Sequence, residues 1–313
     1  MKLQAAIKLT QEDLPGVKSL LNQFPAQEPD SLVNIGCVYF KEGDYVSALK
    51  NFTAAMQMSG FEPQLLYNVA LCHYKLKEYA PALKYIADII ERGIREHPEL
   101  SVGMATEGLE VRSVGNTATL HSSALVEAFN LKAATEFQLK NFEGAREALT
   151  DMPPRAEAEL DPVTLHNLAL INTEENPTES FNKLQFLLQQ QLVVQQEQET
   201  AGILACPPET FANLLLLYCK YEYYDMAADV LAEHADLTYK YLSNYMFDFL
   251  EALITEQTAP EEAYMKFDAM SAKYGENLRR AATQLTEAKR RQDPQAINSA
   301  AAIYEQAMDL YNL

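Results

Sequence analysis

Two stretches of the chain, SLVNIGCVYFKEGDYVSALKNF (residues 31–52) and LLYNVALCHYKLKEYAPALKYI (residues 65–86), match each other at a spacing of 34 residues. Small residues coincide at Gly36 and Ala70. Within each stretch apolar residues recur three and four positions apart, which is the period of one face of an α-helix. The two stretches therefore indicate a repeated helical unit.

The segment between the two helical patterns of the first stretch predicts a tight turn. Gly43 suits the end of one helix, and the Asp44 side chain suits the cap of the next. A helix–turn–helix unit with a period of 34 residues is the pattern of the tetratricopeptide repeat. We number each unit so that Gly36 and Ala70 occupy position 8. Small residues at positions 8 and 20 let the helices approach, and bulky residues at positions 4, 7, 11, 17 and 24 fill the seam.

The expected fold is all-α, a tetratricopeptide-repeat superhelix (α-solenoid) of stacked antiparallel helix pairs. We expect one array over residues 1–313 that is a fragment of a longer one. The expected units are about 1–28 (truncated), 29–62, 63–96, 126–161, 162–195, 208–243 and 244–275, with a helical pair at 276–313 and insertion loops at 97–125 and 196–207.

Composition narrows the function classes. The net charge is −19 and the pI is about 4.7, which disfavours binding to nucleic acid or to an anionic membrane. No apolar run reaches membrane-spanning length. The cysteines are far apart and form no C-x-x-C pair, so we expect no metal site and small buried thiols in a reducing, cytoplasmic compartment.

The chain lacks the side-chain constellations that catalysis requires. The five histidines are dispersed, without the i, i+4 spacing of metal ligands, and no Gly-rich phosphate loop or nucleophile motif occurs. We expect no cofactor, no metal and no enzymatic activity. The basic group Arg279, Arg280 and Lys289–Arg291 is interpreted as a solvated helix face with i, i+4 ion pairs.

A repeat array offers a surface for binding. On the first helix of each unit, positions 2, 5, 6, 9, 12 and 13 share one face, which lines the concave side of a stacked array. Position 6 is Asn in four of six units, namely Asn34, Asn68, Asn167 and Asn213. An amide carries both a donor and an acceptor, so it can bond a peptide unit bidentately. The alternative is that these amides bond the adjacent unit or water.

The candidate partner-binding residues of this groove are mostly apolar, aromatic or amide side chains. They are Val33, Asn34, Cys37, Phe40, Lys41, Tyr67, Asn68, Leu71, Tyr74, Lys75, Asn130, Ala134, Phe137, His166, Asn167, Leu170, Asn213, Leu216, Cys219 and Lys220. Such a surface suits an extended hydrophobic or proline-containing peptide. The three lysines at position 13 either contact carbonyls or acids of the partner or lie in solvent.

Three longer segments carry a more specific resemblance: HPELSVGMATEGLEVRSVGNT (97–117), DMPPRAEAELDPVTLHNLAL (151–170) and PPETFANLLLLYCKYEYYDMAADVLAE (207–233). They resemble the tetratricopeptide-repeat subunit of the intraflagellar transport B complex, the family of intraflagellar transport subunit seventy or tetratricopeptide repeat protein thirty. The resemblance runs from about Leu3 to residues 257–263 and continues more loosely to the C-terminus. The Gln-rich part of the second insertion departs from the compact family form.

The resemblance implies a non-catalytic scaffold that wraps an extended, proline-rich segment of intraflagellar transport subunit fifty-two. It also implies contacts with other B-complex core subunits and with kinesin-2. It further implies a role in cilium assembly, an influence on tubulin polyglutamylation, and a location in the cytoplasm and the cilium or flagellum, at the axoneme. It implies neither nucleic-acid binding nor membrane insertion.

Two alternatives remain open. One is a co-chaperone-type adaptor that binds a peptide terminus, which is typically built with Lys at position 5 and Asn at position 9. Neither residue occurs at its position here. The other is the binding arm of a tubulin-modifying enzyme assembly whose catalytic part lies elsewhere.

Overall fold

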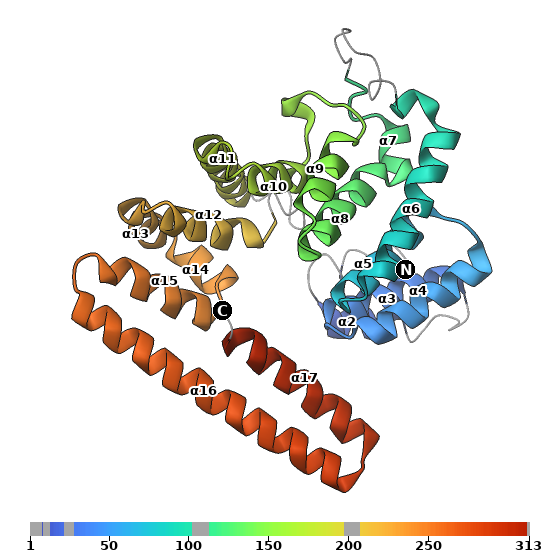
Figure 1. Cartoon of the computed structure of the whole chain (residues 1–313). Helices are drawn as coiled ribbons and strands as arrows, with labels where there is room; N and C mark the ends of the chain where they lie inside the picture. Colours follow the sequence, from blue (N-terminus) through green and yellow to red (C-terminus); the bar gives the residue numbers. More distant parts are fainter. Residues whose placement is uncertain (1–7, 9–12, 22–27, 102–112, 197–206, 312–313) are drawn as a thin grey trace. The chain divides into compact units, whose positions relative to one another are not determined.

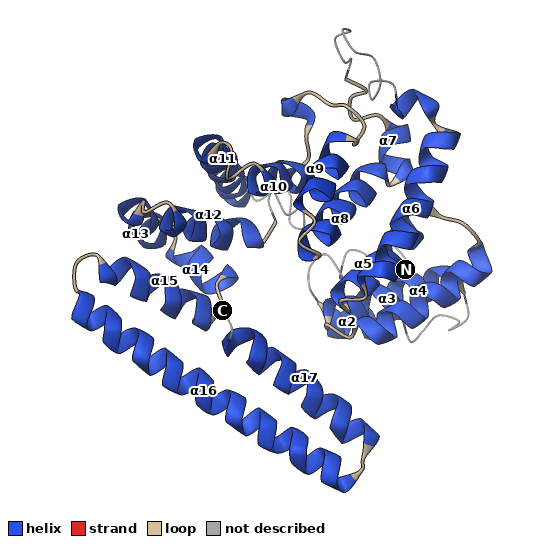
Figure 2. Cartoon of the chain, viewed as in Figure 1, coloured by secondary structure: helices blue, strands red, loops and turns tan. Residues whose placement is uncertain are grey.

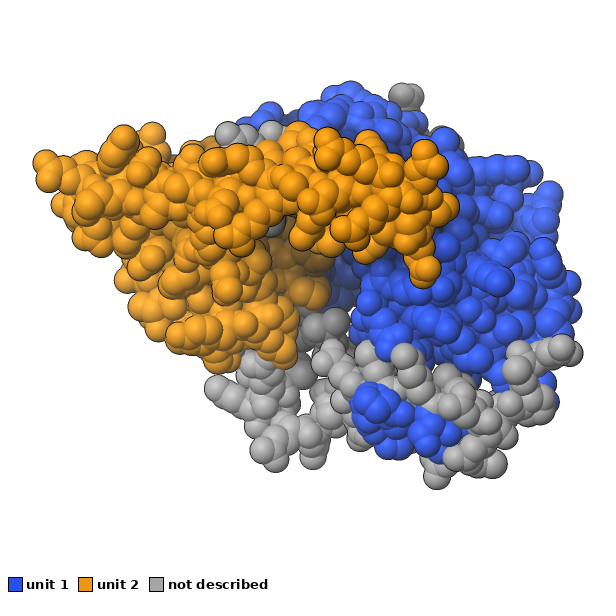
Figure 3. All heavy atoms as spheres, turned by 90° about the horizontal axis from the view of Figure 1, so that it is seen from below, with its two compact units in different colours: residues 1–207 blue, residues 208–313 orange. Residues whose placement is uncertain are grey.

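The computed structural model describes residues 8, 13–21, 28–101, 113–196 and 207–311. Over these residues every regular element is a helix and no strand occurs (Figure 2), so the expected all-α tetratricopeptide-repeat class is confirmed. Two compact units divide the chain, Met1–Pro207 and Pro208–Leu313, coloured separately in Figure 3. Parts of both insertion loops, 102–112 and 197–206, lie outside the described residues, as does Cys206.

The first unit consists of helix pairs joined by short turns (Figure 1). Its helices are α2 (Leu14–Leu21), α3 (Pro29–Lys41), α4 (Tyr45–Ser59), α5 (Pro63–Lys75), α6 (Tyr79–Glu96), α7 (Ala118–Ser123), α8 (Leu125–Gln138), α9 (Phe142–Thr150), α10 (Pro162–Ile171) and α11 (Pro177–Gln196), with 3₁₀ turns at Pro98–Ser101 and Glu157–Glu159. Each pair α3–α4, α5–α6, α8–α9 and α10–α11 packs together, and α4 also contacts α5 as α6 contacts α8. Neighbouring pairs therefore bury a shared core.

Four turns between paired helices have the same backbone conformation. At position 15 of each, one residue has a positive φ. These residues are Gly43, Lys77, Lys140 and Glu222, with φ of 81°, 60°, 63° and 63°. In the first turn the Asp44 N–H donates to Tyr39 O at 2.9 Å, which closes the helix end, and the Asp44 side chain accepts from Ser47 N at 3.0 Å. The predicted roles of Gly43 and Asp44 are confirmed.

Small residues make the close approach between paired helices possible. Gly36 is buried on α3, and a Cβ at this position would lie 2.6 Å from Cε1 of Phe52 on α4. Ala70 takes the place of Gly36 in the next pair, and position 20 is Ala48 in the first pair and Ala82 in the next. All three alanines have no exposed surface. The seam predicted for positions 8 and 20 is therefore a real contact, and its geometry excludes larger side chains.

The second unit begins with α12 (Glu209–Lys220) and α13 (Tyr224–Glu233), continues through α14 (Ala235–Tyr241) and α15 (Asn244–Glu256), and ends in α16 (Pro260–Arg291) and α17 (Pro294–Tyr311). Figure 1 shows α16 and α17 side by side as a long hairpin. The sequence predicts a unit boundary at 275/276, whereas α16 is one helix of 32 residues that runs through this point. Tyr274, Ala281 and Ala288, seven residues apart, are buried along this helix.

Candidate functional site

The first helices of four pairs present the same stripe of side chains, at positions 2, 6, 9 and 13, which we term the outward stripe. On α5 it consists of Gln64, Asn68, Leu71 and Lys75, with exposed residues at its ends and half-buried residues between them. The same order of exposure holds for Asp30, Asn34, Cys37 and Lys41 near α3, for Val163, Asn167, Leu170 and Glu174 near α10, and for Glu209, Asn213, Leu216 and Lys220 on α12. Spacings of four, three and four residues keep each stripe on one helical face.

Aromatic pairs lie across the turn of three helix pairs, beside the outward stripes of α3 and α5 and at the end of α8, which is not one of the four helices with the stripe. In each, the side chain at position 12 packs against the one at position 17 across the turn. The ring centroids are 5.2 Å apart for Phe40–Tyr45, 6.0 Å for Tyr74–Tyr79 and 5.3 Å for Phe137–Phe142. Phe137 and Phe142 are 38% and 47% exposed. Only the first member of each pair is a groove candidate from the sequence, although the repeat spacing also marks Tyr45, Tyr79 and Phe142 at position 17.

Three candidate groove residues lie in the interior instead. Asn130, His166 and Cys219 are buried, so they present almost no surface to a partner. The Asn130 amide donates to Val126 O at 3.0 Å and to Thr164 Oγ1 at 2.8 Å, which ties α8 to α10. Position 6 of α8 is also covered, because Leu131 belongs to a core cluster. The middle of α8 therefore packs in the interior and offers no surface to a partner at positions 5 and 6.

Several apolar candidate residues are half-buried, so one part of each side chain packs against the core and another part is exposed. Val33, Cys37 and Phe40 pack against a cluster that contains Phe52 and Cys72. The equivalent residues of the next unit, Tyr67, Leu71, and Tyr74, pack against a cluster that contains Leu131. Burial raises the pKa of Tyr67 to about 12, so its hydroxyl stays protonated at neutral pH. A substitution at these positions changes both stability and surface.

The amides at position 6 fall into two kinds. Asn34 and Asn68 are half-buried and make no side-chain hydrogen bond within the described part of the chain. Asn167 is also half-buried, but its Nδ2 donates to Asn130 Oδ1 at 2.8 Å. This bond is the alternative left open by the sequence, in which a position-6 amide bonds the neighbouring helix pair, here α8. Asn213 is half-buried on α12.

The remaining candidates lie at the rim of the stripes. Lys41, Lys75 and Lys220 are exposed, and the Lys220 ammonium lies 5.5 Å from the ring centroid of Tyr221. Ala134 on α8, Leu170 on α10 and Leu216 on α12 are half-buried. The charges of Lys41 and Lys75 lie at the exposed ends of their stripes.

The end of the first insertion is bound to the segment that precedes α10. Val114 N donates to Pro154 O at 2.9 Å, and Asn116 Nδ2 donates to Glu159 O at 2.8 Å. The sequence predicts an insertion loop at residues 97–125, whereas its described part contains α7 and is hydrogen-bonded to residues 154 and 159. No sequence signal pointed to this anchoring, because it depends on contacts about 40 residues apart in the chain.

His73 contacts other side chains of the fold, and Cys72 and Cys219 are buried. His73 Nδ1 lies 2.7 Å from Glu78 Oε2, and its ring stacks on Tyr85 with centroids 5.6 Å apart. Burial raises the pKa of the Cys72 thiol to about 12 and that of Cys219 to about 11, so both remain neutral. Among the described residues, no three His, Cys, Asp or Glu side chains form a group that could hold a metal ion. In the same residues, no helix combines the length and the apolar character needed to span a membrane.

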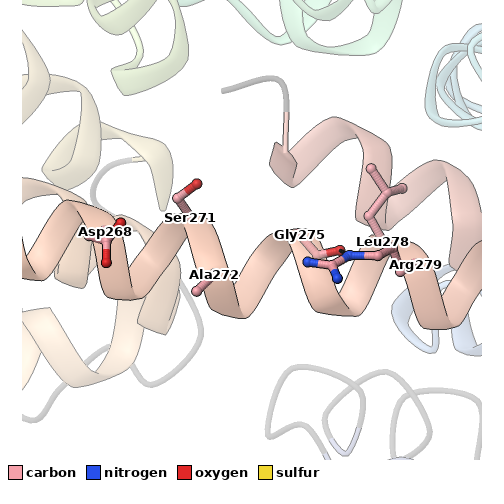
Figure 4. A pocket seen from close by; sticks show the side chains of 6 residues that line it. All are labelled: Asp268, Ser271, Ala272, Gly275, Leu278 and Arg279. Atoms are coloured by element: carbon pink, nitrogen blue, oxygen red, sulfur yellow. Dashed lines mark hydrogen bonds between the residues drawn. The ribbon is translucent and has the colours of Figure 1, made fainter.

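An open hollow of 390 Å³ lies along α16 (Figure 4). Its six lining residues all come from this one helix, from Asp268 to Arg279. It is therefore a furrow on a helix surface and not an enclosed site. Further along α16, Arg280 pairs with Glu276 and Arg291 with Glu287, as the i, i+4 interpretation of the basic group predicts.

Comparison with protein families gives a match over residues 210–313 to the intraflagellar transport protein 70 C-terminal domain. Intraflagellar transport protein 70A of Xenopus tropicalis is 58% identical over 311 residues, and that of Homo sapiens is 56% identical over 321 residues. Both alignments cover 99% of this chain and 46% of the relative. The chain thus spans about half the length of the curated relatives it matches.

Solved structures share the fold at low sequence identity. The crystal structure of the APC/C hetero-tetramer Cut9-Hcn1 aligns with a TM-score of 0.56 at 16% identity, covering 98% of this chain and 48% of that one. A Rap protein complexed with Competence and Sporulation Factor aligns with a TM-score of 0.54 at 14% identity, covering 96% of this chain and 79% of that one. At these identities the likeness concerns the fold alone.

Proposed function

The chain belongs to the intraflagellar transport protein 70 family, and from this premise we propose that it serves as a non-catalytic scaffold within an intraflagellar transport complex. Its location is then the cytoplasm and the cilium or flagellum, at the axoneme, where the scaffold supports cilium assembly. Helix pairs that expose one repeated face are suited to holding another protein chain. Effects on kinesin-2 transport and tubulin polyglutamylation follow indirectly from assembly of the complex.

The proposed partner is an extended, proline-rich segment of intraflagellar transport subunit fifty-two, which crosses the outward stripes of the first unit. Other core subunits of the B complex bind elsewhere on the chain. The observation that carries the proposal is the recurrence of half-buried amides and apolar side chains beside aromatic pairs on α3 and α5. Amides can bond a peptide main chain, and aromatic rings pack well against proline.

The surface does not suit a clamp for a peptide terminus. Such a clamp needs cations that converge on a carboxylate. On α5, position 5 is Tyr67 and position 9 is Leu71, and the nearest cation of the stripe, Lys75, lies at its exposed end. An internal, extended segment therefore fits better than a chain end.

Substitution at the aromatic pairs tests the proposal. In the full-length protein, Tyr74→Glu and Phe137→Glu are expected to weaken binding of the proline-rich segment at least about tenfold each, because a charge replaces an apolar contact. Met58→Glu is the matched control, since Met58 is 55% exposed on α4 and lies outside the stripe. The dissociation constant is measured by calorimetry, with circular dichroism to confirm folding. Unchanged affinity in both aromatic variants would refute the groove.

A further inference from the structure

A continuous chain of hydrogen bonds connects a buried arginine with the outward stripe of α10. Arg155 Nη2 donates to Asp161 Oδ2 at 3.0 Å, and Thr164 Oγ1 donates to the same oxygen at 2.6 Å. Asn130 Nδ2 then donates to Thr164 Oγ1, and Asn167 Nδ2 donates to Asn130 Oδ1, both at 2.8 Å. We call these five residues the amide relay.

The chemistry of its members gives the amide relay one direction. Arginine only donates, and the ionised Asp161 only accepts, so the Thr164 hydroxyl directs its proton to Asp161 and accepts from Asn130. The second proton of the Asn130 amide is used by Val126 O at 3.0 Å. Asn130 therefore presents its oxygen to the next residue, and Asn167 can bond it only through its own N–H.

Arg155, Thr164 and Asn130 are buried, whereas the Asp161 side chain is 32% exposed and Asn167 reaches the surface. The Arg155 side chain is 2% exposed, Thr164 is 2% exposed and Asn130 is 5% exposed. A reversed amide in such surroundings would leave a buried donor or acceptor unpaired. Asn167 is half-buried next to Val163, which is 46% exposed four residues earlier on the same face. One N–H and the oxygen of Asn167 are not used by the relay.

We propose that the amide relay fixes Asn167 in one orientation and that its remaining N–H and oxygen bind one peptide unit of an extended partner segment crossing α10. The proposal rests on the proposed function and adds a point at which the main chain, not a side chain, is recognised. A side-chain amide that is already oriented loses less conformational freedom on binding than a free one. Thr164 is then a positioning residue, because it acts through Asn130 and Asn167.

Asn68 supplies a matched control within the same chain. It occupies position 6 of α5, as Asn167 does on α10, and makes no side-chain hydrogen bond within the described residues. A change in Thr164 should therefore leave Asn68 unaffected. The Thr164→Val substitution keeps the shape of the side chain and removes the hydroxyl that accepts from Asn130 Nδ2 and so fixes the orientation of the Asn130 amide.

The first experiment tests orientation without any partner. Full-length protein labelled with ¹⁵N at asparagine is compared as wild type and as Thr164→Val by nuclear magnetic resonance. We expect the Asn167 side-chain N–H₂ resonances to shift in the variant and those of Asn68 to stay in place. Unshifted Asn167 resonances would overturn the amide relay.

The second experiment tests recognition by measuring the dissociation constant for the proline-rich segment of subunit fifty-two. Asn167→Ala is expected to weaken binding about tenfold and Thr164→Val about threefold or more, in line with loss of a buried hydrogen bond. The double variant Thr164→Val/Asn167→Ala should bind no more weakly than Asn167→Ala alone, because Thr164 acts through Asn167. The fold-losses of affinity in Thr164→Val and Asn68→Ala should instead multiply when the two substitutions are combined. Multiplying effects of Thr164→Val and Asn167→Ala, or unchanged affinity in Asn167→Ala, would overturn the recognition role.

Failure of the inference about Asn167 can be distinguished from failure of the proposed function. If the aromatic variants weaken binding and Asn167→Ala does not, the groove stands and the inference about Asn167 fails. If the aromatic variants also bind normally, the proposed function fails and the recognition role of Asn167 fails with it. In that case the resonance comparison still decides whether Thr164 orients the amide.

Discussion

Replacing Arg155 by Met removes a charge from the interior of the first unit, and we expect a loss of about 2–3 kcal/mol in the free energy of unfolding. The Arg155 side chain is 2% exposed and bonds Asp161 at 3.0 Å. A charge-assisted bond of this kind contributes ~1.5–3 kcal/mol. The bonds of Arg155 Nη1 to Asn116 Oδ1 and Glu159 O are 3.4 and 3.5 Å long and add little.

Asp161 limits the size of this loss. After the substitution its carboxylate still accepts from Thr164 N at 2.9 Å and from Thr164 Oγ1 at 2.6 Å. Its side chain is also 32% exposed, so water continues to solvate the charge. The loss should therefore stay below the ~3–5 kcal/mol that is typical when a fully buried ion pair loses one partner.

The loss should depend on pH. Burial acts to raise the pKa of Asp161, but hydrogen bonds from Thr164 and Arg155 and the Arg155 charge outweigh it, so the pKa lies below its usual value. A lowered folded-state pKa means that this stabilisation is present above the unfolded value of about 4 and disappears as pH falls through the folded value. The difference between wild type and Arg155→Met should be full at pH 7 and smaller at pH 3.

Urea denaturation followed by circular dichroism measures this difference at both pH values. Arg146→Met is the control, because Arg146 also pairs with a carboxylate, Glu175 at 2.9 Å, but its side chain is 39% exposed. An exposed pair contributes at most about 1 kcal/mol. A loss below 1 kcal/mol for Arg155→Met, or an equal loss at both pH values, would refute the reasoning.

Three further substitutions test the repeat geometry. Gly36→Ala should destabilise the chain by about 1–3 kcal/mol, since the new Cβ would lie 2.6 Å from Phe52; an unchanged melting temperature would contradict the close approach of α3 and α4. Asp44→Ala should cost about 1 kcal/mol by removing the cap on Ser47 N, as measured by urea denaturation, and no loss would mean that the cap is dispensable. Lys140→Gly should stabilise by up to about 1 kcal/mol in thermal unfolding, because φ is 63° there; destabilisation would count against this explanation.

Repeat spacing made the helix pairs predictable from sequence. The coincidence of Gly36 with Ala70 marks a close approach that only small residues allow, and the structure places Phe52 against Gly36. The turn at Gly43 was predictable for a similar reason, since glycine adopts a positive φ without steric cost. Lys77, Lys140 and Glu222 adopt the same conformation without any such signal, because backbone bonds at the helix end impose it.

The limits of the sequence appear where burial depends on neighbouring helices. Position alone could not distinguish Val33 and Tyr67, which are half-buried at position 5, from Asn130, which is buried at the same position. Asn130 is covered because α10 packs on it: its amide N–H donates to Thr164 Oγ1 and its oxygen accepts from Asn167 Nδ2, both at 2.8 Å. Position 275 shows a second limit: a single Gly275 within a helical pattern costs about 1 kcal/mol and does not end α16.

The outward stripes of the first unit are proposed to hold an extended segment of subunit fifty-two. Site-specific photo-crosslinking in the full-length complex tests it most directly, with a photoreactive phenylalanine analogue at Tyr74 or at Val46. Val46 is 66% exposed on α4, outside the stripe, and serves as the control. We expect crosslinks from Tyr74 to the proline-rich segment and none from Val46. Crosslinks to that segment from Val46 and not from Tyr74 would contradict it.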